Sequence, residues 1–342
     1  MANRPSVTLS RATTSTANMI FIPTLRSDSS LTESHSHRSR CPGRRLPRCV
    51  GSPVVSDLSS IRVIGGRTYD FSRQAVVMAI VNRTPDSFHD KGRTFALEKA
   101  TEAVRHAAAE GADWIDIGGV PFAPGPEVTA AEELDRVLPV VEAARDLAVV
   151  SVDTFRPEVA AEVIRHGAAV VNDTSGLRDP AMADAVAGTD AQLVICHSLA
   201  APRTLYPSPR YRDVTAEVGD FLRQKVALAL SRGVRPDQII IDPGHDLNKN
   251  TLHSLEITRR LDEIAAIGYP MLAALSNKDF IGETLDRPQQ ERLAGTLATV
   301  VFSLLRGARI MRVHDVRAAS DAIRMTEAIL GWREPAYLKH NI

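Results

Sequence analysis

The sequence predicts an α/β protein, a single-domain (β/α)8 TIM barrel that follows a disordered N-terminal extension. Two observations predict the barrel. Between residues 76 and 330, eight short apolar runs rich in β-branched residues alternate with eight longer, Ala-rich amphipathic stretches. Each run is continuously apolar, as expected for parallel strands that are covered on both faces. A doubly wound sheet is the structural alternative, but no Gly-rich dinucleotide loop follows the first run, which favours the barrel.

Each element follows from this pattern in turn. Strands are expected at 76–81, 114–117, 149–153, 169–172, 192–196, 239–242, 271–275 and 309–313. Helices are expected near 96–110, 130–147, 157–166, 180–187, 214–232, 252–267, 289–306 and 315–330. Several of these helices end at glycine, the usual C-terminal signal: Gly111, Gly167, Gly233 and Gly307.

Two further segments belong to the barrel region. Residues 61–66 and 69–73 are expected to form a small hairpin that plugs the N-terminal end of the barrel. The longest interruption of the pattern, at 198–213, is rich in Pro and Arg. It is either a substrate lid or a plain surface excursion.

Residues 1–60 differ in composition from the rest of the chain. They hold eight Arg, no Lys and three acids, a formal charge of +5, so a chain with 41 basic and 41 acidic residues leaves −5 for residues 61–342. With 19 Ser or Thr and no periodicity, the segment buries too little apolar surface to offset the entropy of ordering it. It is either an organellar transit peptide or a stretch upstream of the true start codon. The Ala/Arg-rich body, typical of a high-GC bacterial gene, favours the second.

Composition also excludes several classes of protein. No run approaches the roughly 18 consecutive apolar residues of a membrane-spanning helix. The balanced charge argues against broad nucleic-acid binding. Cys41, Cys49 and Cys196 form neither a disulfide framework nor a metal-ligand spacing. The single cysteine of the body is typical of a reducing compartment, so we expect a cytoplasmic protein.

Polar side chains end all eight predicted strands. A barrel places its chemistry at these carboxyl ends, and burying so many ionisable groups in one place is costly without a ligand or mutual pairing. The strand-end residues, in order, are Asn82, Asp116, Asp153, Asn172 with Asp173, His197, Asp242, Ser276 with Asn277 and Lys278, and Arg312 with His314.

The first chemical group in this set is suited to a flat, nitrogen-rich heterocycle. It contains Asp153, Asn172, Asp242 and Lys278. The carboxylates accept from ring amines, the amide both donates and accepts, and the ammonium donates to a ring carbonyl or nitrogen.

The second group is suited to an anion. Arg312 and His314 lie two residues apart and therefore project from the same face of the last strand. With Asn82 they are candidates for holding a phosphate, and Mg²⁺ suits an oxygen-ligand site that phosphate and water complete.

Seven segments, in the correct order, resemble the signatures of the dihydropteroate synthase family. The first, at 78–88, reads Met-Ala-Ile-Val-Asn-Arg-Thr-Pro-Asp-Ser-Phe. The others lie at 111–119, 151–154, 171–174, 242–244, 272–282 and 312–316. The resemblance covers essentially residues 61–342, and seven ordered motifs are far more specific than one short pattern.

The resemblance implies a pterin-binding (β/α)8 barrel and a transferase of folate biosynthesis. Such enzymes join 6-hydroxymethyl-7,8-dihydropterin pyrophosphate to p-aminobenzoate; the pyrophosphate leaves first and the aryl amine then attacks the pterin cation. Loops after the first two strands build the acceptor pocket. Dimers are common in the family, and excess apolar residues at 289–306 and 315–330 are consistent with a homodimer.

The resemblance also implies a role for each site residue. The matching positions for pterin binding are Asp153, Asn172, Asp242 and Lys278; those for pyrophosphate binding are Arg312, His314 and Asn82, with Asn82 also the ligand of the Mg²⁺ cofactor. The catalytic positions are Asp153, Arg312 and His314, and the acceptor pocket would include Ser276, Thr84 and Pro85.

The sequence departs from the family pattern in the loops around this site. The pyrophosphate-contacting Arg of the second loop is Ala123, and the usual Ser-Arg-Lys contains Asn277 in place of Arg. Where the family pattern has Gly-Phe-Gly-Lys, this chain has Asp246, Leu247, Asn248 and Lys249, with His245 before them. A lost charge-assisted contact costs about 1.5–3 kcal/mol.

These departures leave three functions open. The chain resembles a diverged, synthase 2-like paralogue: a working but weak dihydropteroate synthase, a pterin-binding enzyme with another acceptor, or a non-catalytic regulatory protein. Arg83 replaces the apolar residue that usually follows the first-strand Asn. Its guanidinium either substitutes for the missing Arg at the anion site, or it points away from that site or blocks the p-aminobenzoate pocket.

Overall fold

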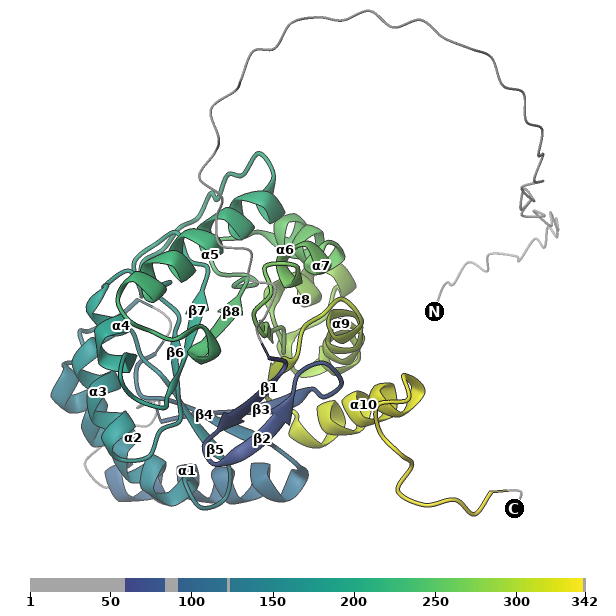
Figure 1. Ribbon diagram of the computed structural model, residues 1–342, viewed down its shortest axis with the longest axis horizontal. Helices are drawn as coiled ribbons and strands as arrows, with labels where there is room; N and C mark the ends of the chain where they lie inside the picture. Colours follow the sequence, from purple (N-terminus) through teal and green to yellow (C-terminus); the bar gives the residue numbers. More distant parts are fainter. Residues whose placement is uncertain (1–58, 84–91, 122–123, 341–342) are drawn as a thin grey trace, which may run out of the picture. The chain divides into compact units, whose positions relative to one another are not determined.

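The chain folds into the expected TIM barrel. The structure, a computed structural model, describes residues 59–83, 92–121 and 124–340, so the expected 1–60 extension lies outside the described residues except for its last two positions. Eight parallel strands are ordered β8-β7-β6-β5-β4-β3-β10-β9, with helices around them (Figure 1). A parallel bridge between Ile241 and Met271 nearly closes the circle.

All eight predicted barrel strands are present, with ends that differ from the prediction by at most one residue. They are β3 Val76–Asn82, β4 Trp114–Gly118, β5 Val149–Asp153, β6 Val170–Asp173, β7 Gln192–Cys196, β8 Ile239–Asp242, β9 Leu272–Ala274 and β10 Ile310–Val313. Because neighbouring strands are parallel, their carboxyl ends gather at one end of the barrel, which we call the mouth.

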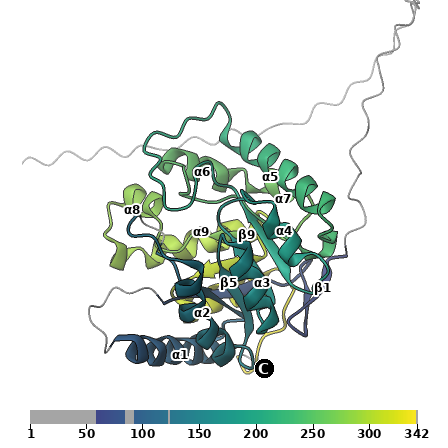
Figure 2. The same cartoon turned by 90° about the vertical axis from the view of Figure 1, so that its left-hand side faces the viewer.

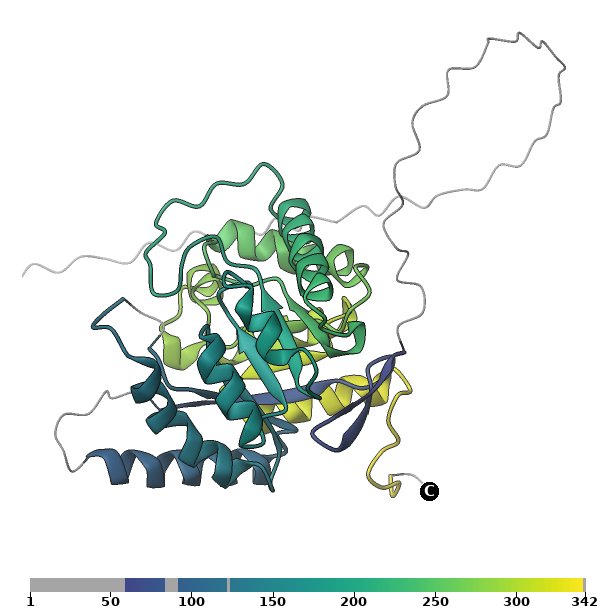
Figure 3. The same ribbon diagram turned by 60° about the vertical axis from the view of Figure 1, so that its left-hand side comes forward.

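The predicted hairpin closes the other end. Strands β1 (Ile61–Ile64) and β2 (Arg67–Asp70) pair antiparallel. The Tyr69 ring meets Trp114 inside the barrel edge to face, with centroids 5.8 Å apart. Figure 3 shows the hairpin at the end of the barrel opposite the segment 198–213.

Ten helices are present in the described residues. They are α1 Gly92–Glu110, α2 Ala130–Ala144, α3 Pro157–Arg165, α4 Ala181–Val186, α5 Val214–Ser231, α6 Thr251–Arg259, α7 Leu261–Ala265, α8 Asp279–Leu285, α9 Leu293–Leu305 and α10 Val316–Ile329. Their apolar faces and the outer faces of the strands form the larger core, and the barrel interior forms a smaller one. None of the described helices has both the length and the apolar character that a membrane span requires.

The structure corrects two of the predicted helices. The stretch 289–306 begins as a 3-10 turn, Gln289–Glu291, and becomes α-helical only at α9. The stretch 252–267 is not one helix, because it bends at Arg260 into α6 and α7. Helix α8 was not predicted, and Figure 2 shows it near the mouth, away from β1.

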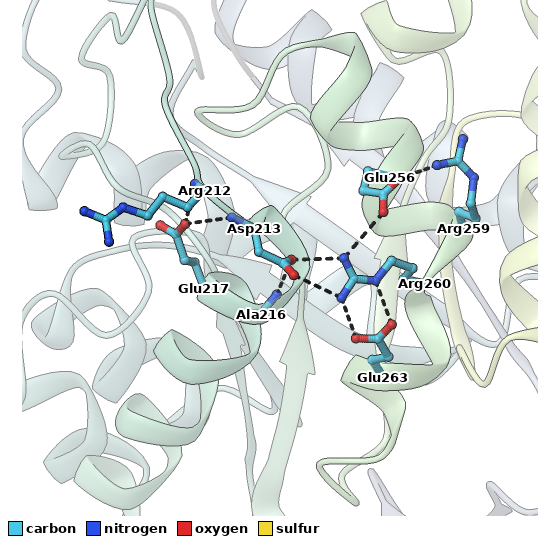
Figure 4. A network of polar contacts seen from close by, with 8 residues as sticks. All are labelled: Arg212, Asp213, Ala216, Glu217, Glu256, Arg259, Arg260 and Glu263. Carbon is cyan, nitrogen blue, oxygen red and sulfur yellow. Dashed lines mark hydrogen bonds and ion pairs between the residues drawn. The ribbon is translucent and has the colours of Figure 1, made fainter.

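Arg260 organises the bend between α6 and α7 (Figure 4). Its guanidinium binds both carboxylate oxygens of Asp213, over 3.0 and 3.3 Å, and those of Glu263, over 2.6 and 2.8 Å. Asp213 also accepts from Ala216 N over 3.0 Å and so caps α5. The network therefore joins the end of the 198–213 segment to the α6–α7 bend.

A capping box starts α2, directly after the second mouth loop. Thr129 Oγ1 accepts from Glu132 N over 3.2 Å, and Glu132 Oε2 accepts from Thr129 N over 2.8 Å. We expect Thr129→Ala to lower the free energy of unfolding by about 1 kcal/mol, measured by urea denaturation. Thr129→Ser keeps the hydroxyl and should be nearly neutral; equal losses in both variants would contradict the capping role.

Candidate functional site

The guanidinium of Arg312 joins two carboxylates at the mouth. Its Nε donates to Asp116 Oδ2 over 2.6 Å and its Nη2 to Asp153 Oδ2 over 3.3 Å. The side chain of Asp116 is fully buried and that of Arg312 is 17% exposed. Burial alone would lower the pKa of Arg312, but Asp116, Asp153 and Asp242 together raise it above its ordinary value. Arg312 is therefore a permanent cation among acids.

Asp116 also holds the amide of Asn172. It accepts from Ser151 Oγ over 2.6 Å and from Asn172 Nδ2 over 3.1 Å. Asn172 Oδ1 is buried and has no hydrogen-bond partner among the described residues. Because an unpaired buried acceptor is costly, this oxygen is a candidate acceptor for a ligand donor.

Asp242 and Lys278 form the next part of the mouth. Asp242 ends β8, is nearly buried, and accepts from Gly244 N over 2.7 Å. Burial raises the pKa of Asp242, while the Gly244 N–H and the Lys278, Lys249 and Arg312 cations oppose that shift. Among the described residues the Lys278 ammonium makes no hydrogen bond or ion pair, so its three donors are open to a ligand.

Ser276 and His314 contact each other. His314 N donates to Ser276 Oγ over 3.2 Å, and His314 Nδ1 lies 3.0 Å from the same oxygen. Burial, with Arg312 and Lys278, lowers the pKa of His314, so its imidazole is neutral at pH 7. Ser276, expected in the acceptor pocket, thus orients a residue expected at the anion.

The first mouth loop is described only in part. Asn82 ends β3 and is exposed, and its Oδ1 lies over Gly118, where an added Cβ would come within 2.8 Å. Thr84 and Pro85, expected in the acceptor pocket, lie outside the described residues. Arg83 Nη1 donates to the carbonyl oxygens of Asp135 and Arg136 on α2, over 2.9 and 2.6 Å. This geometry agrees with the alternative in which Arg83 points away from the anion site.

A pocket of about 220 Å³ opens beside Asp153. Its walls include Phe155 and Thr174, the described part of the second loop around Pro124, Ser198 and residues 200–206. Arg203 Nη1 crosses to donate to Pro126 O over 2.8 Å. The 198–213 segment is therefore part of the mouth and not a plain surface excursion. Ala123, where the family pattern has Arg, lies outside the described residues.

Lys249, which lines this pocket, forms a buried pair with His197. Lys249 Nζ lies 2.8 Å from His197 Nδ1 and donates to the carbonyl oxygens of Gly244 and Leu247, over 2.8 and 2.9 Å. Burial lowers the pKa of Lys249 to about 7, against the opposing effects of Cys196 and Asp242. Burial, then Lys249, lowers the pKa of His197 to about 2.

Asp153 is the mouth acid that titrates near neutrality. Its side chain is 26% exposed and accepts from Thr174 Oγ1 over 3.2 Å. Burial raises the pKa of Asp153 to about 7, the Arg312 cation opposes the rise, and the Asp116 carboxylate adds to it. A carboxyl of this kind switches between accepting and donating across the physiological range.

Sequence reasoning assigned no role to Asp116 or to Arg203. Asp116 was noted as a strand end, and its charge inside an otherwise apolar strand was the available signal. Its three partners come from β5, β6 and β10, up to 196 positions away. Arg203 lies in a segment without periodicity, so no pattern connects it with Pro126.

The expected Mg²⁺ can be tested against the donors at the mouth. No group of three or more His, Cys, Asp or Glu residues within the described part of the chain could hold a metal ion. Asn82 offers one amide oxygen, on an exposed side chain at the end of β3. A single protein oxygen fits Mg²⁺ that arrives with substrate phosphates and keeps its waters, and it does not fit a resident all-protein cage.

Known proteins resemble this chain over most of its barrel. The model of a family described as pterin binding enzymes matches residues 78–314. An inactive dihydropteroate synthase 2 of Mycobacterium leprae (strain TN) is 44% identical over 279 residues, 79% of this chain and 95% of that protein. The dihydropteroate synthase of Escherichia coli (strain K12) is 39% identical over 275 residues, 79% of this chain and 96% of that protein.

A solved structure is similar over the same region. Xanthomonas albilineans dihydropteroate synthase with 4-aminobenzoic acid superposes with a TM-score of 0.73 at 38% identity, covering 80% of this chain and 99% of that one. The same enzyme in complex with 7,8-dihydropteroate gives a TM-score of 0.69 at 36% identity, with the same coverage.

Proposed function

Because the chain belongs to the pterin-binding enzyme family, we propose that it is a dihydropteroate synthase-type transferase that keeps its pterin site and releases pyrophosphate slowly. One observation carries the proposal. The four proposed pterin-binding residues lie at the mouth: Asp153, Asn172, Asp242 and Lys278. Two of their polar groups, Asn172 Oδ1 and the Lys278 ammonium, have no hydrogen-bond partner among the described residues.

The proposed pterin lies flat among these four residues. Asp153 and Asp242 accept from the ring amine and ring N–H groups, Asn172 Oδ1 accepts a further donor, and Lys278 donates to a ring nitrogen or carbonyl. The framework that holds them is already in place, because Asp116 accepts hydrogen bonds from both Arg312 and Asn172. Little reorganisation is then needed on binding.

The proposed anion end combines Arg312 and His314 with Asn82. Arg312 supplies the permanent positive charge, and the neutral His314 supplies a neutral N–H donor to the phosphate oxygens. Asn82 would hold Mg²⁺, which when bound neutralises charge on the pyrophosphate. These residues stabilise the leaving group as negative charge develops on it.

The reaction then proceeds in two steps. The bond between the pterin methylene carbon and the pyrophosphate oxygen breaks, and its electron pair leaves with the pyrophosphate. The amine of p-aminobenzoate attacks the resulting cation, forms the carbon–nitrogen bond and loses one proton to water. Asp153, when ionised, faces the cation and stabilises it electrostatically.

The expected weakness lies in the first step. The second-loop Arg of the family pattern is Ala123, and Arg83 is engaged with α2. A lost charge-assisted contact of about 1.5–3 kcal/mol slows the reaction roughly 10- to 150-fold if it acts fully in the transition state.

A second candidate is a pterin-binding protein without turnover. The observation that favours it is the name of a relative that is 44% identical over most of both chains, an inactive dihydropteroate synthase 2. An assay with the pterin pyrophosphate, p-aminobenzoate and Mg²⁺ separates the two candidates. Measurable 7,8-dihydropteroate above a Lys278→Met control supports the transferase, and binding without product supports the second candidate.

Pterin affinity should depend on pH through Asp153. Its pKa of about 7 means that the accepting carboxylate is lost as the pH falls below 7. We therefore expect affinity to fall by up to about tenfold per pH unit below that value, measured by calorimetric titration between pH 5.5 and 8.5. Asp153→Asn has no titrating group at this position, so its affinity should depend on pH only through the titration of the ligand, and the pH profile should be flatter. An identical slope in the two proteins would contradict the assignment of the pH dependence to Asp153.

We also propose a cytoplasmic homodimer. Support for the dimer comes from apolar side chains exposed on two helices that pack together, Phe302 and Leu305 of α9 and Met325 and Ile329 of α10. Support for the compartment is Cys196, a free and buried thiol. Sedimentation velocity and cell fractionation test the two statements.

A further inference from the structure

Lys278 is held in place by its backbone and not by its side chain. It is the N-cap residue of α8, with an extended backbone, and it follows Asn277 in the left-handed region at φ 58°. Its ammonium makes no hydrogen bond within the described part of the chain. The position of this cation therefore depends on what fixes residues 277–280.

Asp246 fixes the residues that follow Lys278. Its Oδ2 accepts from Asp279 N over 2.7 Å and from Phe280 N over 3.4 Å, the first two amides of α8. Its Oδ1 accepts from the buried Ser254 of α6 over 2.8 Å, and Ser254 Oγ accepts from Asp246 N over 3.2 Å. One carboxylate thus joins α8 to α6.

The conformation of Asp246 accounts for its residue type. It lies at φ 63°, in the left-handed region, where the family pattern has glycine. Asp and Asn are the side chains that adopt this region most readily. The substitution keeps the backbone that glycine allows and adds a carboxylate that reaches α8.

Arg292 fixes the residue that precedes Lys278. Its Nη1 donates to Asn277 O and to Asp279 Oδ1, over 2.9 Å in both cases. The side chain is 14% exposed and packs against Gly282, where a Cβ would come within 2.3 Å of the guanidinium. The loop carrying Lys278 is therefore held on both sides.

We propose that Asp246 and Arg292 are positioning residues that hold Lys278 where it binds the pterin. This inference rests on the proposed pterin site. The ammonium sits on a flexible four-carbon stem, so fixing its Cα lowers the entropy lost when a ligand orders the side chain. The Asp246 carboxylate, which the family pattern does not contain, would thus help maintain a lysine contact that the pattern does contain.

The Asp246 carboxylate and its hydrogen bonds to Asp279 N and Phe280 N are called the brace. The direct test removes the brace without straining the backbone. Asp246→Gly restores the residue of the family pattern and deletes the carboxylate, and we expect about tenfold weaker binding of 6-hydroxymethyl-7,8-dihydropterin pyrophosphate by calorimetry. Asp246→Asn tolerates the same φ and can still accept from Asp279 N, so it should restore affinity to within about threefold. Failure of this rescue would overturn the proposal.

A double-mutant cycle separates positioning from a general loss of stability. In a Lys278→Met background, Asp246→Gly should have no further effect on affinity. Asn250→Ala is the matched control: it removes the side-chain cap of α6, which accepts from His253 N, and should lower stability but leave affinity unchanged. An equal loss of affinity with and without Lys278 would overturn the proposal.

Hydrogen exchange tests the brace independently of the ligand. Asp246→Gly should accelerate exchange of the Asp279 and Phe280 amides at least tenfold, and Asn250→Ala should not. If the wild-type protein bound no pterin while this acceleration was observed, the proposed function would fail and the brace would stand. Unchanged exchange in Asp246→Gly would reject the brace itself.

Discussion

Asp116→Ala is expected to lower the free energy of unfolding by about 3–5 kcal/mol, the loss typical of breaking a buried ion pair. The substitution leaves the Arg312 guanidinium with only the longer contact to Asp153, at 3.3 Å. It also removes the acceptor of Ser151 Oγ and of Asn172 Nδ2. Urea denaturation followed by circular dichroism measures the loss.

Two companion variants identify the cause. Asp116→Asn keeps an acceptor oxygen and loses the charge, so its effect should be intermediate. Asp116→Ala combined with Arg312→Met removes both charges of this pair, and it should be less destabilised than the sum of the single variants because neither ion is left without the other. Strict additivity, or a loss below about 1 kcal/mol for Asp116→Ala, would show that the pair is not a structural hub.

Lys278→Met should have the opposite profile, a large loss of affinity with little loss of stability. The ammonium has no hydrogen-bond partner in the described structure, so removing it breaks no described hydrogen bond or ion pair. If it donates to the pterin, the charge-assisted hydrogen bond contributes about 1.5–3 kcal/mol, and affinity should fall roughly 10- to 150-fold. Calorimetric titration with the pterin pyrophosphate measures this change.

A second lysine provides the matched control. Lys225, on α5, donates to Leu177 O over 2.9 Å, so Lys225→Met removes an equal charge at a place outside the proposed site. We expect unchanged pterin affinity. Equal losses in the two variants would point to net charge as the cause, and an unaffected Lys278→Met would remove Lys278 from the pterin site.

The barrel was predictable because its signal is local. Each strand is a short apolar run, and polar residues mark the strand ends, so the run at 149–153 or at 239–242 is sufficient to place a strand and its last residue. Parallel strands in a closed barrel then bring Asp153, Asn172 and Asp242 to one end without further information.

Contacts between distant segments were not predictable in the same way. The direction of Arg83 depends on carbonyl oxygens of α2 more than 50 positions away. Helix α8 has only seven residues, too few for helical periodicity to distinguish it from a loop. The roles of Asp246 and Arg292 depend on α8, because their partners include its first amides and the residues around Lys278.

The glycine-to-Asx changes illustrate the difference between pattern and structure. In the sequence, Asp246 and Asn248 are departures from a glycine pattern beside the site. In the structure both have positive φ, and Asn248 Oδ1 accepts from Ser198 Oγ, Leu199 N and Ala200 N over 3.1, 2.7 and 2.9 Å. The changes therefore preserve the backbone and connect loops.

Calorimetric titration of the wild-type protein with 6-hydroxymethyl-7,8-dihydropterin pyrophosphate and Mg²⁺, followed by p-aminobenzoate and an assay for 7,8-dihydropteroate, tests the retained pterin site most directly. We predict saturable one-to-one binding that Lys278→Met weakens, with product formed roughly 10- to 150-fold more slowly than by the Escherichia coli relative. The proposed function would be contradicted if the protein did not bind the pterin pyrophosphate, or if it formed product as fast as that relative does.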